Sequence, residues 1–516
     1  MEKQKLTGYI LLAAVACCVL SYCIFLQFLS PTFYESDSYY HVATSSFIRD
    51  FGFRYNFHWT QFSVYKDLFG DKDFLFHLLT VPFLNLSNDI VVAGKYAIIF
   101  YNALFILIFV FILRKYLPDY LVCCFLFLPF LSATFTTYFL YLRSFTLANI
   151  LTILGIYFLI NKKTIGVFLV SLLYPLTHTS FFTIVVFAFI CETCRWIFVR
   201  EFFLRNLYLA VIGMLAGCLI HPNFPNNLLY THLQFLVVNY ANKGLDLGLG
   251  SELFSYPTMR VFIENFAVFL TLNIIFWIAL ISRKRISLST AVWLICSNFY
   301  LLLALTADRH WYITNILVFI AFASYLKDWE EMGGWDKLSR KVSIFIAVYL
   351  ISIFLYFPAG IKSLEANINL NTILGNHYKQ VALWMKEHIP PGKLIYHNNW
   401  SDSAYFLCFN PNNNYLVVLD PIYMYYRYPE LYLFYRSLSG GQIDNIYGAL
   451  TNIFKASYGY AHKDSLFYIK IKKDPGHFKV LYEDDLGIIF QVGYRRICND
   501  PISQAGFKSD VTLPYN

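Results

Sequence analysis

Two carboxylates and an imidazole lie close together early in the chain, in the segment from Glu35 to His41. A carboxylate in such a cluster can orient or deprotonate an acceptor hydroxyl group, or hold a divalent cation through its oxygens. We therefore take Asp37, Glu35 and His41 as candidate catalytic residues. The structural alternative is a helix N-cap at Ser36 or Asp37 with solvated acids around it.

Two arginines stand where a phosphate could bind. On the topology derived below, Arg143 and Arg309 lie at non-cytoplasmic helix ends, against the usual charge bias, and a planar fork of donors suits phosphate. A local ion pair between Asp308 and Arg309 is the alternative. His178 and His221 also stand at such helix ends, and His178 joins the candidate phosphate-binding set. A single histidine there is more often structural than a ligand.

Two further segments carry possible substrate contacts. Asp73 and His77 are four residues apart, so they share one face of an expected interfacial helix, either as substrate contacts or as a structural pair. Residues 222–259 form a long loop in which glycines alternate with single leucines before Glu252. This pattern predicts a mobile lid that carries Asp246 or Glu252 and is flanked by His221, with a solvated connector as the alternative.

The elements that must position these residues are membrane helices. Of the 516 residues, 58% are hydrophobic and 14% charged, whereas about a quarter of a soluble protein is charged. Apolar blocks recur from Tyr9 to Phe357, and a helix needs about 20 such residues to cross a bilayer. They predict about eleven crossings, of which the fourth to sixth are short enough to form a re-entrant pair instead. The eleven predicted crossings are residues 6–29, 90–113, 119–138, 145–160, 164–175, 179–197, 206–221, 260–281, 286–306, 311–326 and 342–357.

The basic residues predict the sidedness of these helices. With Lys3 and Lys5 in the cytoplasm, every cytoplasmic connection is basic, as expected for membrane proteins. These connections contain Arg114, Lys115, Lys162, Lys163, Arg195, Arg200, Arg205, Arg283, Lys284, Arg285, Lys327, Lys337, Arg340 and Lys341. We therefore interpret the basic residues behind the formal charge of +8 as topology signals and not as a nucleic-acid-binding surface. Residues 30–89, 222–259 and everything after Pro358 are predicted to be extracytoplasmic.

Residues 358–516 are expected to form a separate extracytoplasmic domain, following a membrane domain of residues 1–357. Hydrophobicity falls after Ile361, and a helix predicted over Thr372 to His388 ends before a Pro-Pro-Gly stop. Short apolar runs alternate with helix-like segments after that point, which predicts a mixed α/β domain. The apolar runs are Leu394 to Tyr396, Tyr415 to Leu419, Phe478 to Tyr482 and Gly487 to Val492.

The order of these features resembles the GT-C superfamily of membrane glycosyltransferases, closest to the oligosaccharyltransferase catalytic subunits. The resemblance rests on Asp37 to His41, the Asp71 to Phe83 helix, Glu252, Arg309 and the C-terminal domain. It implies that Asp37 binds the acceptor and a metal, Glu252 helps to hold the acceptor, and Arg309 binds the donor phosphate. Trp400 and Asp402 match the Trp-Trp-Asp signature of that branch in part.

One departure from that branch bears on the metal. The second extracytoplasmic loop has Arg143 where oligosaccharyltransferases have a second acidic pair. Whether the reaction needs a divalent cation, Mg²⁺ or Mn²⁺ held by Asp37, is therefore left open by the sequence. Protein mannosyltransferase-like and aminoarabinose transferase-like members need no such pair, so a metal-independent reaction with Asp37 as the base fits equally well.

The sequence therefore predicts an inverting glycosyltransferase of the inner membrane, with a cytoplasmic N-terminus and a periplasmic C-terminal domain. It would move a sugar or oligosaccharide from a polyprenyl phosphate or diphosphate to a protein, glycan or lipid acceptor. Two rivals are a transporter or flippase for lipid-linked glycans and a non-catalytic scaffold of an envelope assembly.

Overall fold

The structure, a computed structural model, describes residues 2–234, 247–282, 286–331 and 340–493. Several residues used in the sequence analysis lie outside these ranges, namely Asp246, Arg283, Lys284, Arg285 and Lys337. The described chain is mostly helical, with one four-stranded sheet near its C-terminal end. The predicted fold class, a polytopic helical chain with a C-terminal α/β part, is thereby confirmed.

Two described helices are long and apolar enough to cross a membrane: α1 (Glu2–Gln27) and α4 (Ile90–Leu113). Four such spans result if each of two bent helix pairs counts as one. The first pair joins α5 (Asp119–Phe125) and η3 (Leu128–Leu131) to α6 (Ala133–Phe139) across a bend of 91°. The second joins α13 (Thr258–Glu264) to α14 (Phe266–Ser282) across a bend of 78°.

The bend before α6 has a local cause. Pro129 occupies the short η3 helix, and the Ser132 side chain accepts a hydrogen bond from the Phe135 backbone amide to begin a new helix. Proline interrupts a helical ladder, and a serine cap starts one. The chain therefore turns within the predicted span over residues 119–138, which stays a prediction in bent form.

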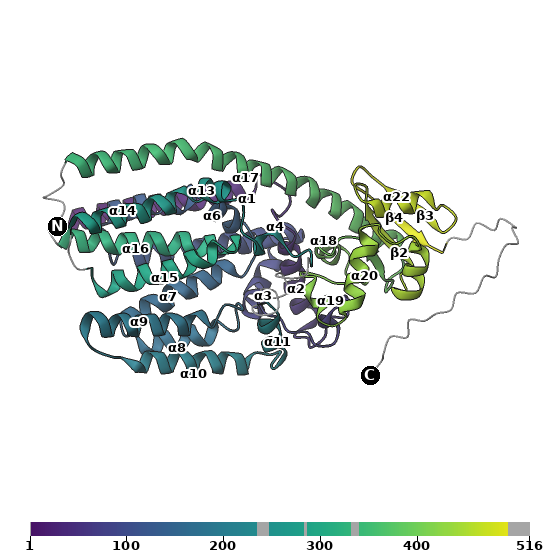
Figure 1. The fold of residues 1–516 in the computed structure, drawn as a ribbon, viewed down its shortest axis with the longest axis horizontal. Coiled ribbons are helices and arrows are strands. Elements are labelled where there is room, and N and C mark those ends of the chain that lie inside the picture. The colour runs from purple at the N-terminus through teal and green to yellow at the C-terminus, as the bar shows by residue number, and fades with distance from the viewer. Residues whose placement is uncertain (1, 235–246, 283–285, 332–339, 494–516) are drawn as a thin grey trace, which may run out of the picture. The chain divides into compact units, whose positions relative to one another are not determined.

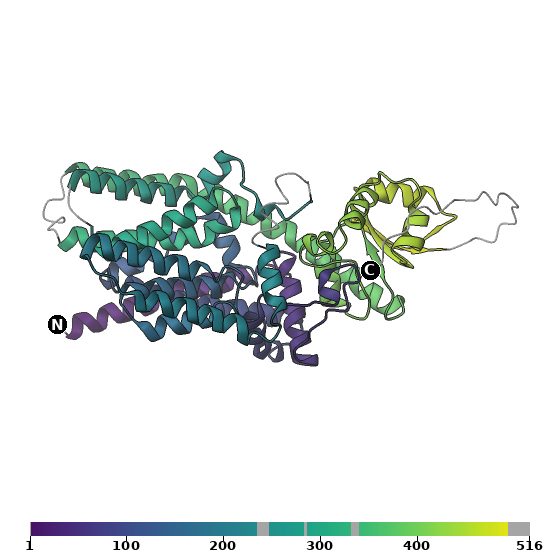
Figure 2. The same ribbon diagram turned by 60° about the horizontal axis from the view of Figure 1, so that its bottom comes forward.

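The remaining apolar helices are shorter and pack along one another (Figure 1 and Figure 2). Helices α8 and α10 pack closely, since a Cβ atom on Gly213 would lie 2.7 Å from the Phe168 carbonyl oxygen. Small residues allow such close approach between membrane helices. The count of eleven crossings stays a prediction. These helices are α7 (Phe145–Ile160), α8 (Thr164–Leu173), α9 (Thr183–Val199), α10 (Leu204–Ile220), α15 (Leu288–Ala304) and α16 (Trp311–Glu331).

Short helices at one end of these long helices carry the polar residues of interest. The buried helix α2 (Asp37–Phe51) packs on α3 (Phe74–Thr80) and on η2 (Val81–Asn85). The other short elements are η1 (Val64–Lys66), α11 (Asn226–His232), η5 (Ser251–Leu253) and η6 (Asp308–His310).

A long helix links the membrane part to the C-terminal part of the chain. The helix α17 runs from Arg340 to His388 without a break, so residue 358, the predicted start of the second domain, lies inside it. The next helices are α18 (Asp402–Phe409) and α19 (Ile422–Tyr425). The predicted strand at Tyr415 to Leu419 is an extended segment that binds residues 60–62, through the Gln61 amide to the Tyr415 carbonyl at 2.8 Å.

The chain divides into two compact units, residues 1–392 with 399–433 and residues 393–398 with 434–516. The second unit contains the sheet, in the order β1-β2-β4-β3. Its strands are β1 (Ile395–His397), β2 (Tyr458–His462), β3 (Phe478–Glu483) and β4 (Gly487–Val492). Its helical segments are α21 (Ile446–Gly448), the π-helix η7 (Ala449–Ile453) and α22 (Leu466–Lys473), and α20 (Pro429–Ser439) leads into it.

Candidate active site

Arg143 lies at the centre of the candidate site and contacts three carboxylates. Its Nη2 atom lies 2.5 Å from Oε2 of Glu35 and 2.7 Å from Oδ2 of Asp37, and its Nη1 atom lies 2.7 Å from Oε2 of Glu252. These acids come from the start of α2 and from η5, which are far apart in the chain. The guanidinium therefore holds three segments together through charge-assisted hydrogen bonds.

Ser38 fixes the geometry between this acidic segment and Arg143. Its hydroxyl donates to Oε1 of Glu35 at 2.9 Å and accepts from the Leu142 backbone amide at 3.0 Å. The start of α2 and the turn before Arg143 are thus connected by one buried side chain. A serine in the first turn of a helix is well placed for such local bonds.

The cluster has perturbed acidities. Burial raises the pKa of Glu35 to about 8 against the opposing charge of Arg143, and the nearby charge of Asp37 raises it further. Burial also raises the pKa of Asp37, and again Arg143 opposes the shift. Carboxylates with perturbed pKa values beside a specific charge partner are typical of functional sites.

A cavity of about 60 Å³ brings most of the predicted residues together. Arg309 and His178 line this cavity with the carboxylate cluster, although several long helices separate these residues in the chain. Among the described residues, no carboxylate lies within ion-pair distance of Arg309, in contrast to Arg143. Its guanidinium is therefore open to an anionic ligand. The predicted residues that line the cavity are Asp37, His41, Asp73, Arg143, His178, Glu252 and Arg309.

Behind His41 lies a chain of buried polar groups. Its Nδ1 atom lies 2.7 Å from Nε2 of His77, and Nδ1 of His77 lies 2.7 Å from Oδ2 of Asp71. All three residues are at most 3% exposed. Burial lowers the pKa of His41 well below its usual value, and His77 lowers it further. The line Asp71, His77, His41 can hold or pass a proton, and it ends at the cavity.

Asp73 and His77, predicted to share a helix face as substrate contacts or as a structural pair, have different hydrogen-bond partners. His77 turns to Asp71 instead, and Asp73 accepts a hydrogen bond from the Ser144 hydroxyl at 2.7 Å. Lys72 lies 3.2 Å from Asp73. Burial raises the pKa of Asp73, but the charges of Lys72 and His41 outweigh this effect and the net shift is downward. The helix α3 begins only at Phe74, and Asp73 is the residue immediately before it.

Besides Glu35 and His77, three predicted residues do not line the cavity. His221 contacts the Asp71 carbonyl oxygen through Nε2 at 3.0 Å and so helps to position Asp71. Trp400 donates from Nε1 to the Gly248 carbonyl oxygen at 2.9 Å, shortly before Glu252. Asp402 is buried and accepts a hydrogen bond from the Tyr378 hydroxyl at 2.6 Å. None of the three lines this cavity.

Lys72, Asp420 and the role of Asp71 were not predicted from the sequence. Asp420 lines the cavity from the segment before α19, and burial raises its pKa to about 6. Its neighbour Leu419 has a φ angle of 70°, a left-handed conformation that leucine rarely adopts. Strained backbone of this kind clusters at functional sites. The dipeptide Asp420-Pro421 is a turn signal, but its place beside Asp37 depends on the tertiary fold.

The residues around Arg143 do not fit the divalent cation implied by the resemblance. Within the described ranges, no group of three or more His, Cys, Asp and Glu side chains is arranged to hold a metal ion. Glu35, Asp37 and Glu252 direct their oxygens at the guanidinium instead. The Asp37-bound Mg²⁺ or Mn²⁺ stays an untested prediction.

Comparison with known proteins gives matches among solved structures, whereas no family model and no curated protein matches. An oligosaccharyltransferase, AglB from Archaeoglobus fulgidus in complex with an inhibitory peptide and a dolichol-phosphate, aligns with a TM-score of 0.62 at 11% identity. The alignment covers 94% of this chain and 74% of that one. ArnT from Cupriavidus metallidurans bound to undecaprenyl phosphate aligns with a TM-score of 0.56 at 12% identity, covering 93% and 97%.

These two proteins are GT-C membrane glycosyltransferases, and this chain has their fold. The resemblance inferred from the order of sequence motifs is therefore confirmed at the level of the fold. At sequence identities of 11% and 12%, these two matches show the fold alone.

Proposed function

We propose that this protein is a membrane glycosyltransferase that moves a sugar or oligosaccharide from a polyprenyl phosphate or diphosphate to an extracytoplasmic acceptor. The observation that carries the proposal is a single cavity lined by Asp37 and by Arg309, which has no carboxylate partner among the described residues. It lies in a fold whose solved examples bind dolichol-phosphate and undecaprenyl phosphate. A base and a phosphate-binding cation side by side are the two groups that such a transfer needs.

In the proposed reaction, the acceptor oxygen attacks the anomeric carbon from the face opposite the phosphate. The bond between that carbon and the phosphate oxygen breaks, and its electron pair stays on the phosphate. Asp37 orients the acceptor and takes its proton, with His41 beside it on the same face of α2. Arg309 and His178 lie where they can bind the phosphate whose charge grows as the bond breaks.

We assign Arg143 to the carboxylates rather than to the donor. It bridges Asp37 to Glu252, the residue proposed to close the site over the acceptor. A fixed cation between these acids can lower the pKa of Asp37 and hold the acidic segments together. This assignment favours the metal-independent version of the reaction.

The test is consumption of a labelled polyprenyl-linked sugar by the purified protein, comparing wild type with Asp37→Asn. We expect the variant to lose transfer by a factor of about 10² to 10⁴, the usual contribution of a positioned base. Asp50→Asn is the matched control, since Asp50 lies on the same helix, is exposed and pairs only with Arg49 among the described residues. The proposal fails if wild type consumes no donor from a panel of mono- and diphosphate carriers. Asp37 is not the base if Asp37→Asn matches wild type.

A further inference from the structure

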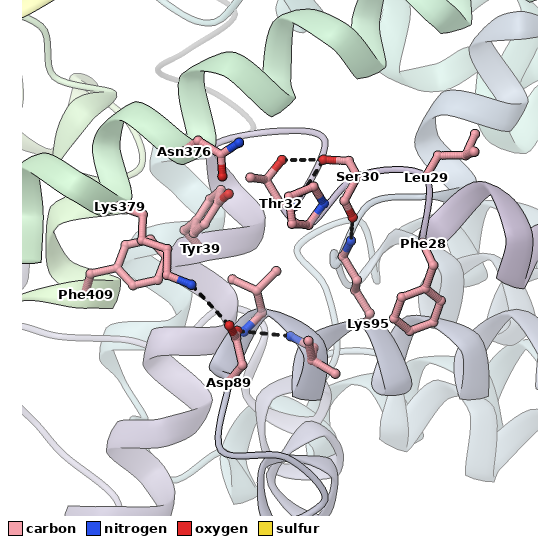
Figure 3. Close-up of a pocket in the computed structure, with 14 residues that line it drawn as sticks. Phe28, Leu29, Ser30, Thr32, Tyr39, Asp89, Lys95, Asn376, Lys379 and Phe409 are labelled. Atoms are coloured by element: carbon pink, nitrogen blue, oxygen red, sulfur yellow. Dashed lines mark hydrogen bonds and ion pairs between the residues drawn. The ribbon is translucent and has the colours of Figure 1, made fainter. Parts of the chain in front are cut away.

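A second cavity, larger than the candidate active site, lies where α1 ends and α4 begins (Figure 3). Its volume is about 340 Å³. It is lined from the segment after α1, from α2, from the first turns of α4 and from α17 and α18. None of its lining residues lines the cavity around Asp37. The two cavities are therefore separate sites.

A buried ammonium group marks this second cavity. Lys95 of α4 is 1% exposed, and its Nζ atom donates to the Gln27 carbonyl oxygen at 2.8 Å and to the Ser30 carbonyl oxygen. Figure 3 shows its contact with Ser30 at the wall of the cavity. Among the described residues, no carboxylate lies within ion-pair distance of this ammonium. A buried charge is costly when only neutral groups surround it.

The rest of the cavity wall is also cationic on balance. Lys379 of α17 lies 3.1 Å from Asp89, and Asp89 in turn caps α4 by accepting from the Val91 amide at 2.8 Å. Asp89 is thus already engaged by a helix end and by one lysine (Figure 3). Two ammonium groups and one carboxylate leave the lining with one excess positive charge. An anion entering the cavity would balance it.

The position of the cavity indicates what carries the anion. It lies at the ends of α1 and α4, the two described helices that are long and apolar enough to cross a membrane. Phe28 and Leu29 line it and are 45% and 50% exposed, so its rim continues the apolar surface of α1. Basic residues at the end of a membrane helix, next to apolar surface, suit a phosphate head group with a hydrocarbon tail.

We propose that this cavity binds the phosphate head of an anionic lipid, at a site distinct from the candidate active site. The phosphate can belong to a bilayer phospholipid or to a polyprenyl phosphate. A lipid bound here would contact Tyr39, which lies on the same helix as Asp37 and His41. The site thus places a lipid against the back of the helix that carries the proposed base.

The experiment is lipid titration of the full chain in detergent, followed by native mass spectrometry. The probes are phosphatidylglycerol, undecaprenyl phosphate, zwitterionic phosphatidylcholine and inorganic phosphate. The test variant is Lys379→Gln, and the matched control is Lys386→Gln, an exposed lysine of α17 that does not line the cavity. All proteins carry Arg309→Gln, so that a lipid phosphate bound at the proposed active site does not mask the result.

We expect anionic lipid to bind more tightly than phosphatidylcholine, and Lys379→Gln to weaken it about fivefold, the effect of one basic residue near a membrane surface. Lys386→Gln should leave it unchanged. Preference for phosphatidylglycerol or for undecaprenyl phosphate assigns the source of the phosphate. Equal binding of phosphatidylcholine, an equal loss in the control, or competition by inorganic phosphate at the same concentration as lipid would overturn the proposal. These readouts need no transfer activity, so they stand apart from the test of Asp37.

Discussion

Arg143 and Arg309 share a side-chain type and a cavity but differ in their partners. Arg143 is surrounded by Glu35, Asp37 and Glu252 at 2.5 to 2.7 Å. For Arg309 the described residues offer no such ion pair, and its pKa is lowered by burial while Glu252 opposes that shift. At the residue scale, the first arginine is already neutralised and the second needs an anion. The two should therefore fail in different ways when replaced.

Replacing Arg309 by Gln should reduce transfer by a factor of about 10² to 10³, because a donor aimed at the developing negative charge is lost. The fold should be retained, since no described ion pair is broken. Donor consumption by purified protein, with melting temperature as the check on folding, measures this. Arg427→Gln is the control, as Arg427 pairs with Asp67 away from the cavity. A variant as active as wild type would remove Arg309 from the donor site.

Replacing Arg143 by Gln should change the pH dependence of transfer. The cation of Arg143 lowers the pKa of Asp37 against the effect of burial, so its removal raises that pKa. Asp37 acts as a carboxylate, and activity is lost as the pH falls through its pKa. The acid limb of kcat/KM should therefore move to higher pH in the variant, and some activity should return on raising the pH. An acid limb at the same pH as in wild type would show that Arg143 does not tune Asp37.

Metal independence is tested in the same assay. If Arg143 takes the place of a divalent cation, wild-type transfer should persist in excess EDTA. Loss of transfer in EDTA, with recovery on adding Mg²⁺ or Mn²⁺, would show that the reaction depends on a divalent cation.

At the scale of elements, the line from Asp71 through His77 to His41 connects the segment before α3, the helix α3 and the helix α2. Its residues are buried, and His221 reinforces it by contacting the Asp71 carbonyl oxygen. The groups that face His41 are His77, Asp73, Lys72 and Arg143. The same contacts therefore both pack two helices and orient an imidazole at the cavity.

Asp71→Asn should destabilise the fold by about 1 to 3 kcal/mol, because a buried hydrogen bond to a charged acceptor is weakened when the acceptor becomes a neutral amide. His77→Gln keeps a donor and an acceptor but cannot pass a proton. If the line acts only in packing, kcat should follow stability in both variants. If it orients or relays a proton at His41, His77→Gln should lower kcat with KM unchanged. Thermal unfolding and initial-rate kinetics on the two variants separate these outcomes.

At the scale of the whole molecule, the GT-C fold predicts a membrane protein, while its sidedness rests on the basic connections in the sequence. On that topology, Lys163 between α7 and α8 is cytoplasmic and Lys473 at the end of α22 is extracytoplasmic. Both side chains are exposed. An impermeant maleimide should label Lys473→Cys in intact cells and Lys163→Cys only after lysis. Labelling of Lys163→Cys in intact cells would reverse the proposed orientation of the site.

Hydropathy and charge spacing alone determined that the chain is a membrane protein, and motif order alone pointed to the GT-C fold. These are local or one-dimensional properties, since a bilayer span is a matter of consecutive apolar residues. Asp37, His41, Glu252 and Arg309 could also be singled out, because charges and imidazoles between apolar blocks are conspicuous. The predicted topology places all four residues on the same side of the membrane, but it does not predict which of them contact one another.

Only the tertiary structure decided which partner each of these residues has. Arg143 contacts Glu252, 109 residues away in the chain, and His41 contacts His77, 36 residues away. Local spacing rules do not predict contacts between residues so far apart in the sequence. His77 contacts Asp71, six residues before it, rather than pairing with Asp73 on the same expected helix face. The lysine-lined cavity between α1, α4 and α17 was equally invisible in the sequence, because burial of Lys95 and its lack of a described counter-ion exist only once distant helices pack together.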